Sequence, residues 1–249
     1  MMNKEFDKSV IRSISISEDI PITKFILDSF YRRINVPITL LGISPISISV
    51  VEAGLYVAKQ YQLPIMFIAS LNQVDIDGGY TGWTPHKFVN IVKEKALEIG
   101  FQGPIIVALD HGGPWLKDSH VHQGLTLEES IERVMKSIEA ALIAGYDIIH
   151  IDTTIDIHSK KPLEVDIVAK RTLDLIEFTE SFRRSKGLPK VDYEIGSDRW
   201  GIKDPDKVKM LIRLVKRGLA ERGLNDVQPV FVVGDIGTRL HPENVMDQI

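Results

Sequence analysis

An aspartate and a histidine stand side by side at the end of a short apolar segment, 104–111 (PIIVALDH). Asp110 offers a carboxylate for proton transfer, and the imidazole of His111 can bind a divalent metal. Because Gly112 and Gly113 follow, we expect the backbone there to approach a ligand closely. From this pair alone a structural role, with the carboxylate capping the next loop, fits equally well.

Polar residues also follow the ends of the other apolar segments, and the carboxyl ends of parallel strands share one face of a sheet. His150 and Asp152 lie two positions apart and face the same way. A buried histidine is more often a hydrogen-bonded structural residue than a ligand, so Asp152 is the better catalytic candidate. Glu194 could act in catalysis, complete a metal site with His111, or form an ion pair with Arg199. The full set of strand-end residues is Ser44, Asn72, Gln73, Asp110, His111, Asp152, Thr153, Thr154, Glu194, Ser197, Asp198 and Asp235.

The longest segment directly after a strand is 72–85 (NQVDIDGGYTGWTP). Its glycines and aromatics suit a loop that folds over a small polar ligand, with Tyr80 or Trp83 as an apolar lid. Asp75 and Asp77 resemble a calcium loop only in part, because the other ligands of such a loop are missing. The residues expected to bind substrate are Ser44, Asn72, Gln73, Gly79, Tyr80 and Asp235.

Six apolar segments must position these residues, and most are rich in Ile and Val without strict alternation, which predicts buried parallel strands. They cover 37–44, 64–70, 104–111, 147–153, 190–195 and 229–234. Helical spacing of apolar residues, with a capping box at Thr126 and Glu129, predicts helices over 22–34, 47–60, 85–99, 128–144, 163–186 and 205–222.

Repeated βα units predict an α/β protein with a parallel sheet, either doubly wound or a (β/α)8 TIM barrel. The sequence has no GxGxxG motif, and polar residues follow nearly every strand, so the barrel is the better interpretation. We expect residues 1–249 to form a single domain. Only about six βα units are visible, and the fifteen residues after Gly234 are too few for two more, which need roughly 60. The barrel is therefore expected to be incomplete, with strands seven and eight missing, unless early strands are overcounted.

The chain has no cysteine, which excludes disulfides, thiolate metal sites and cysteine nucleophiles. A net charge of −4 without a basic patch argues against nucleic acid as a partner. The longest apolar stretches are too short to span a bilayer, and the N-terminus does not resemble a signal peptide. A cytoplasmic protein acting on a small molecule is expected. Histidines in loops or at helix starts should be solvated: His86, His120, His122 and His158.

The motif SxNQVDxxGGYTGxTPxxF at 70–88 closely resembles the D-tagatose-1,6-bisphosphate aldolase Z-type subunit family, whose members are often described as non-catalytic subunits. The resemblance continues through LDHGGP at 109–114, GYDIIHIDT at 145–153 and YEIGS at 193–197. It covers most of the chain from Ile43 to about Val233.

The resemblance implies a barrel related to the class II, metal-dependent aldolases, which are lyases of carbohydrate metabolism. If the roles of those enzymes are carried over to this chain, Asp110 would transfer protons and His111 would bind the metal, which is zinc in those enzymes. Glu194 would correspond to the acidic residue of the fifth strand. The substrate would be a ketose phosphate or bisphosphate, and the partner a second copy or a separate class II aldolase subunit. The sixth strand departs from the class II pattern, because it ends without a histidine and His241 comes later. A non-catalytic stabilising subunit and a metal-dependent ketose epimerase are the alternatives.

Overall fold

The computed structural model describes residues 8–35, 38–200 and 204–234. In chain order the elements are α1 (Lys8–Ser17), α2 (Ile22–Ile34), β1 (Leu41–Ile43), α3 (Ile48–Tyr61), β2 (Ile65–Ser70), α4 (Pro85–Ile99), β3 (Ile105–Asp110), α5 (Asp118–His122), α6 (Leu127–Ala144), β4 (Ile148–Ile151), α7 (Val165–Ser185), β5 (Asp192–Ser197), α8 (Pro205–Glu221) and β6 (Pro229–Gly234).

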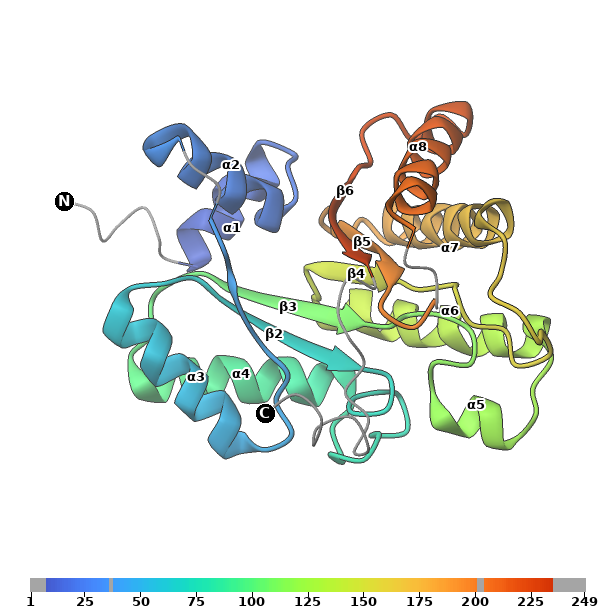
Figure 1. Cartoon of the computed structure of the whole chain (residues 1–249). Helices are drawn as coiled ribbons and strands as arrows, with labels where there is room; N and C mark the ends of the chain where they lie inside the picture. The colour runs from blue at the N-terminus through green and yellow to red at the C-terminus, as the bar shows by residue number, and fades with distance from the viewer. Residues whose placement is uncertain (1–7, 36–37, 201–203, 235–249) are drawn as a thin grey trace, which may run out of the picture.

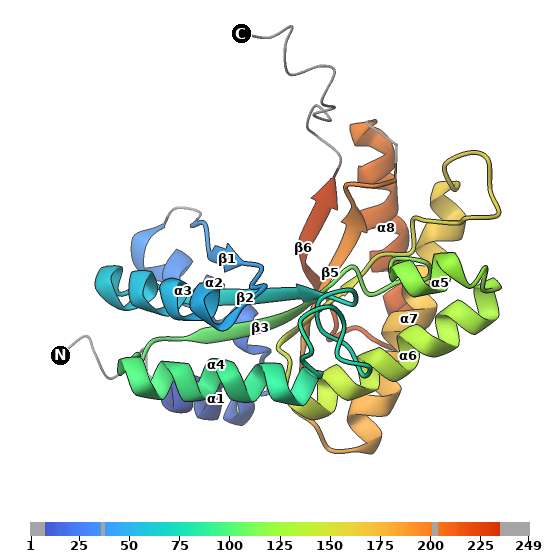
Figure 2. The ribbon, with the colours of Figure 1, turned by 90° about the horizontal axis from the view of Figure 1, so that it is seen from below.

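The six strands form one parallel sheet in the order β1-β2-β3-β4-β5-β6. The sheet curls strongly, so that the direction of β5 and β6 differs greatly from that of β2 and β3 (Figure 2). The expectation of an incomplete barrel is therefore confirmed for the described residues, which build an open half-barrel and not a closed (β/α)8 barrel. All six predicted strands are present, five of them followed by a described helix, and Asp235 lies outside the described residues.

The two faces of the sheet are covered by different helices. Phe67, Val107 and Ile149 are buried against the helices of the convex side. Ile106, Ala108 and Ile148 instead form a second cluster with apolar residues of α1 and α2, among them Ile22 and Ile26. Figure 1 shows α1 and α2 on the side of the sheet opposite α3 and α4. Burial on both faces explains why the strand sequences lack alternation.

Helix ends follow the signals in the sequence. Thr126 and Glu129 form the reciprocal capping box of α6, which ends at Gly145 in the left-handed conformation. Pro85 opens α4 after the N-cap Thr84. The predicted bounds are confirmed for α2, α4 and β6 and are within two residues for the other predicted helices.

Two helices, α1 and α5, were not predicted. The sequence of α1 (KSVIRSISIS) is rich in serine and β-branched residues, which have low helix propensity, and α5 has only five residues. The predicted first strand shortens to three residues, because β1 has a ladder partner on one side only. Among the described helices, none combines the length and apolarity that crossing a membrane requires.

Candidate metal and catalytic site

His111 follows β3 with a left-handed backbone (φ 50°), which is uncommon for a residue other than glycine. Its Nδ1 lies 2.9 Å from Oδ2 of Asp152, which is fully buried just after β4. Burial disfavours the charged form of Asp152, but the hydrogen bond from His111, the charge of His150 and the Thr154 hydroxyl outweigh it and lower its pKa. The ionised carboxylate can only accept, so Nδ1 of His111 carries the proton. In the neutral ring Nε2 then has a free lone pair, as in the carboxylate–histidine pairs that prepare metal ligands.

His150, in β4, links β3 to β5. Its Nε2 lies 2.9 Å from the carbonyl oxygen of Gly196 and must donate there, while Nδ1 lies 3.0 Å from Oδ1 of Asp110. Burial opposes protonation, but the bond to Asp110 and the charges of Glu194 and Asp152 raise the pKa of His150 to about 9. At neutral pH both ring nitrogens therefore carry protons, and Nδ1 donates to Asp110. The His111 amide nitrogen, 3.1 Å from Nδ1, can donate to it only when the ring is neutral.

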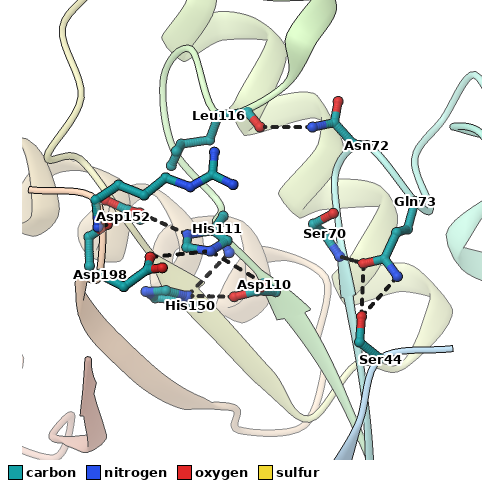
Figure 3. Close-up of polar contacts among 12 residues, drawn as sticks. Ser44, Ser70, Asn72, Gln73, Asp110, His111, Leu116, His150, Asp152 and Asp198 are labelled. Carbon is teal, nitrogen blue, oxygen red and sulfur yellow. Dashed lines mark hydrogen bonds and ion pairs between the residues drawn. The ribbon is translucent and has the colours of Figure 1, made fainter. Parts of the chain in front are cut away.

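Carboxylates surround the free nitrogen of His111. Its Nε2 lies 3.7 Å from Oδ2 of Asp110 and 3.8 Å from Oδ1 of Asp198 (Figure 3). Burial raises the pKa of Asp110, but the hydrogen bond from His150 and the positive charge of that ring lower it by more, so the group is ionised. Glu194, with Oε2 4.0 Å from Nδ1 of His150, has a raised pKa because burial outweighs the charge of His150.

These donors fit a divalent cation. One imidazole nitrogen, Nε2 of His111, is not used in a hydrogen bond with the described residues, and carboxylate oxygens face the same space from β3 and from the end of β5. Asp110, His111 and His150 also lie close enough together to be grouped as potential ligands. The proton states above leave only the first two of these with a free donor atom.

Gly112 and Gly113 were expected to approach a ligand, but they approach the backbone of β4. The Gly112 amide donates to the His150 carbonyl oxygen at 2.8 Å. A Cβ at Gly113 would lie 1.5 Å from the Asp152 carbonyl oxygen, and one at Gly112 would lie 2.7 Å from that of His150. The glycines thus let the ends of β3 and β4 come together, which places His111 against Asp152.

The predicted substrate-binding residues Ser44 and Gln73 lie in a separate polar group near the ends of β1 and β2 (Figure 3). Gln73 accepts from the Ser70 amide at 2.9 Å, and its amide nitrogen donates to the Ser44 hydroxyl at 2.8 Å. Both side chains hold protein atoms together.

Asn72 joins the loop after β2 to the start of α5. Its Oδ1 accepts from the Asp118 amide at 2.9 Å, and its Nδ2 donates to the Leu116 carbonyl oxygen at 3.3 Å. Beside it, the buried Lys117 ammonium lies 2.5 Å from Asp75 and 2.7 Å from Asp77. The two aspartates that resembled a calcium loop therefore bind a cationic side chain of the protein.

The aromatics and glycines of this loop have different roles. Gly79 (φ 52°) packs on the backbone of Asn72 and Gln73, where a Cβ would lie 2.6 and 2.5 Å from their carbonyl oxygens. Trp83 is buried in the core and stacks on Phe88, so its expected role as a lid is wrong. Tyr80 is exposed.

Three residues of this region were left out of the predicted site or placed wrongly. His150 was interpreted as structural, although its shared parity with Asp152 indicated a position beside the Asp110–His111 pair. Asp198 was noted at a strand end without a role. His120 was expected to be solvated but is buried, with Nδ1 3.1 Å from the Ser130 hydroxyl. Burial, with the charge of Lys117, lowers the pKa of His120 to about 4.

Over most of its length, the chain is similar to a solved structure. The crystal structure of a probable tagatose 6 phosphate kinase from Sinorhizobium meliloti 1021 matches 75% of this chain with a TM-score of 0.63 and 26% identity. The match covers 46% of that protein, so this chain spans about half the length of its relative.

A family model described as D-tagatose-1,6-bisphosphate aldolase subunit GatZ/KbaZ-like matches residues 32–201, which include Asp110, His111, Asp152, Glu194 and Asp198. The family expected from the sequence motifs is thereby confirmed: the chain belongs to the GatZ/KbaZ-like family of tagatose-bisphosphate aldolase subunits.

Proposed function

We propose that the chain is a metal-dependent aldolase component that cleaves or forms a ketose phosphate or bisphosphate. The observation that carries this proposal is the geometry at His111: Nδ1 lies 2.9 Å from the buried Asp152 carboxylate, and Nε2 faces the carboxylates of Asp110 and Asp198. A buried carboxylate that fixes the tautomer of an imidazole is the usual outer shell of a metal ligand. Class II chemistry needs such a ligand beside a proton-transfer group.

His111 and Glu194 would hold the metal, zinc by the resemblance. When bound, the metal would supply polarisation of the substrate carbonyl. Asp110 is the proton-transfer residue: one of its carboxylate oxygens is held by His150, and the other remains available to a substrate hydroxyl or carbon. Asp152 has no exposed surface, so its contribution is to orient His111. Substrate contacts by Ser44, Asn72, Gln73, Gly79, Tyr80 and Asp235 remain predictions.

A non-catalytic stabilising subunit is the second candidate, and two observations favour it. The family is described as an aldolase subunit, and catalytic zinc sites usually have three protein ligands. Among the described residues, only one imidazole of the site has a nitrogen free to bind. In this case the partner would be a separate class II aldolase chain. In either role a sugar phosphate implies a cytoplasmic location, where such metabolites are made and consumed.

Metal analysis together with retro-aldol assays on ketose mono- and bisphosphates tests the proposal. The purified protein should hold a stoichiometric divalent metal and cleave a substrate, and His111→Asn should lose both. Asparagine suits the left-handed backbone there and can still donate to Asp152. Asp28→Asn, on α2, is the matched control, since Asp28 pairs with Lys24 on the exposed surface.

The outcomes separate the candidates. Turnover by the isolated chain would exclude a purely accessory role. No turnover alone, but increased stability or activity of a class II aldolase chain on mixing, would overturn the catalytic proposal in favour of the subunit. Epimerised ketose without cleavage would assign the same residues to an epimerase.

A further inference from the structure

We infer that Asp198 is a metal ligand of this site, shared with His111, and that His150 is not a ligand. The inference rests on the proposed metal-dependent function, and it gives a role to a residue that the sequence placed at a strand end without one. With this assignment the ion is held between the ends of β3 and β5, which lie on either side of β4.

The distances carry the first half of the inference. Protein nitrogens and oxygens bind divalent metals such as zinc at about 2.0–2.2 Å, so two atoms on one ion lie no more than about 4 Å apart. Nε2 of His111 and Oδ1 of Asp198 are separated by 3.8 Å. The Asp198 carboxylate has no other ion pair with the described residues. Its side chain is 61% exposed, so an ion can reach it with little loss of protein contacts.

The segment that carries Asp198 is held in place. The Gly196 carbonyl oxygen accepts from His150, and Gly196 itself has a left-handed backbone (φ 96°) in close contact with β6, where a Cβ would lie 2.3 Å from the Val233 carbonyl oxygen. The Ser197 hydroxyl then accepts from the Arg199 amide at 2.9 Å, closing a turn around Asp198. This turn presents the carboxylate toward His111 (Figure 3).

Nδ1 of His150 lies as close to Asp110 as two ligands of one metal ion would lie to each other, but both ring nitrogens of His150 are already used in hydrogen bonds. Nε2 donates to the Gly196 carbonyl oxygen, and Nδ1 is in contact with both Asp110 and the His111 amide. A metal on Nδ1 would have to displace both contacts. His150 is instead a positioning residue that connects Asp110 to the segment carrying Asp198.

Calorimetric titration of the metal-free protein with Zn²⁺ tests the assignment. Wild type should bind one ion, Asp198→Asn should lose about tenfold or more in affinity, and Asp198→Glu should recover part of that loss. His150→Gln should keep one ion per chain, and Asp28→Asn should match wild type. Co²⁺ as a second probe should give an absorption spectrum that Asp198→Asn changes in shape, as loss of a direct ligand requires.

The failures are distinguishable. If wild type binds no ion, both the proposed function and this inference are overturned. If wild type binds but Asp198→Asn binds equally well with an unchanged Co²⁺ spectrum, only the Asp198 assignment is overturned. Loss of the ion in His150→Gln with circular dichroism and melting unchanged would make His150 a ligand and overturn the second half.

Discussion

Two polar regions lie near the carboxyl ends of the strands, and they differ in what their atoms are free to do. The first, the imidazole cluster, consists of Asp110, His111, His150, Asp152, Glu194 and Asp198. The second, the loop clamp, consists of Ser44, Asn72, Gln73, Asp75 and Lys117. In the imidazole cluster one nitrogen and several carboxylate oxygens have no hydrogen-bond donor within the described protein, whereas the clamp residues bond to one another or to backbone. Position at a strand end is therefore insufficient to identify a site, and free donor atoms are the better criterion.

The largest difference between the two regions is expected when the free nitrogen of His111 is removed. His111→Asn should abolish Zn²⁺ binding while the protein remains folded, because Nε2 is the only uncommitted imidazole nitrogen of the imidazole cluster. Calorimetry and thermal melting measure the two effects. Retained stoichiometric binding would show that carboxylates alone hold the ion.

Lys117→Ala should do the opposite, with a large loss of stability and unchanged metal affinity. The substitution leaves the buried Asp75 carboxylate without its cation, and breaking such a pair costs about 3–5 kcal/mol. Urea denaturation measures the change. Lys136→Ala, which breaks an exposed pair with Glu132, is the control and should cost less than about 1 kcal/mol. If Lys117→Ala also lowered the metal affinity, the loop clamp and the imidazole cluster would belong to one site.

Gln73→Ala should cost about 1–3 kcal/mol, because it leaves the half-buried Ser70 amide without its side-chain acceptor. Turnover should change little if Gln73 only holds the loop. Gln60→Ala on the exposed side of α3 is the control for truncation of the same side chain. A KM that rises several-fold with no loss of stability would restore Gln73 as a substrate contact.

The last prediction concerns how the stability of the protein depends on pH. His120, beside the loop clamp, has a pKa of about 4 when folded against an ordinary value of 6.5. Between these pH values the unfolded chain binds more protons, so the stability that neutral His120 provides is present above pH 6.5 and lost on acidification toward pH 4. His120→Gln should flatten the dependence of the free energy of unfolding on pH in this window. His122→Gln, at an exposed position, should leave the slope unchanged.

Much of the fold could be predicted because its signals are local. The apolar runs of β2 and β3, the capping box of α6 and the proline that opens α4 each act within a few residues. The helix α1 could not be predicted in this way, since its serine-rich sequence is stabilised by packing, through Ile11, on the concave face of a sheet formed much later in the chain. Tertiary packing overrides propensity there.

The site was predictable in outline and not in detail. Asp110, His111 and Asp152 converge because parallel strands bring their ends together. The sequence could not indicate that the proton of His111 faces Asp152, that both nitrogens of His150 are occupied, or that Lys117 neutralises Asp75. These depend on distances between side chains about 40 residues apart in the chain.

The close contact of Gly113 with the Asp152 carbonyl oxygen limits how the sequence of this site can change during evolution. A side chain at Gly112 or Gly113 would push β3 away from β4 and separate His111 from Asp152, so these two positions tolerate almost no substitution. The exposed side chain of Tyr80, on the connection after β2, has no such restriction. Divergence toward new substrates or partners should therefore accumulate at exposed positions of the β2–α4 connection, while the backbone that holds His111 against Asp152 changes little.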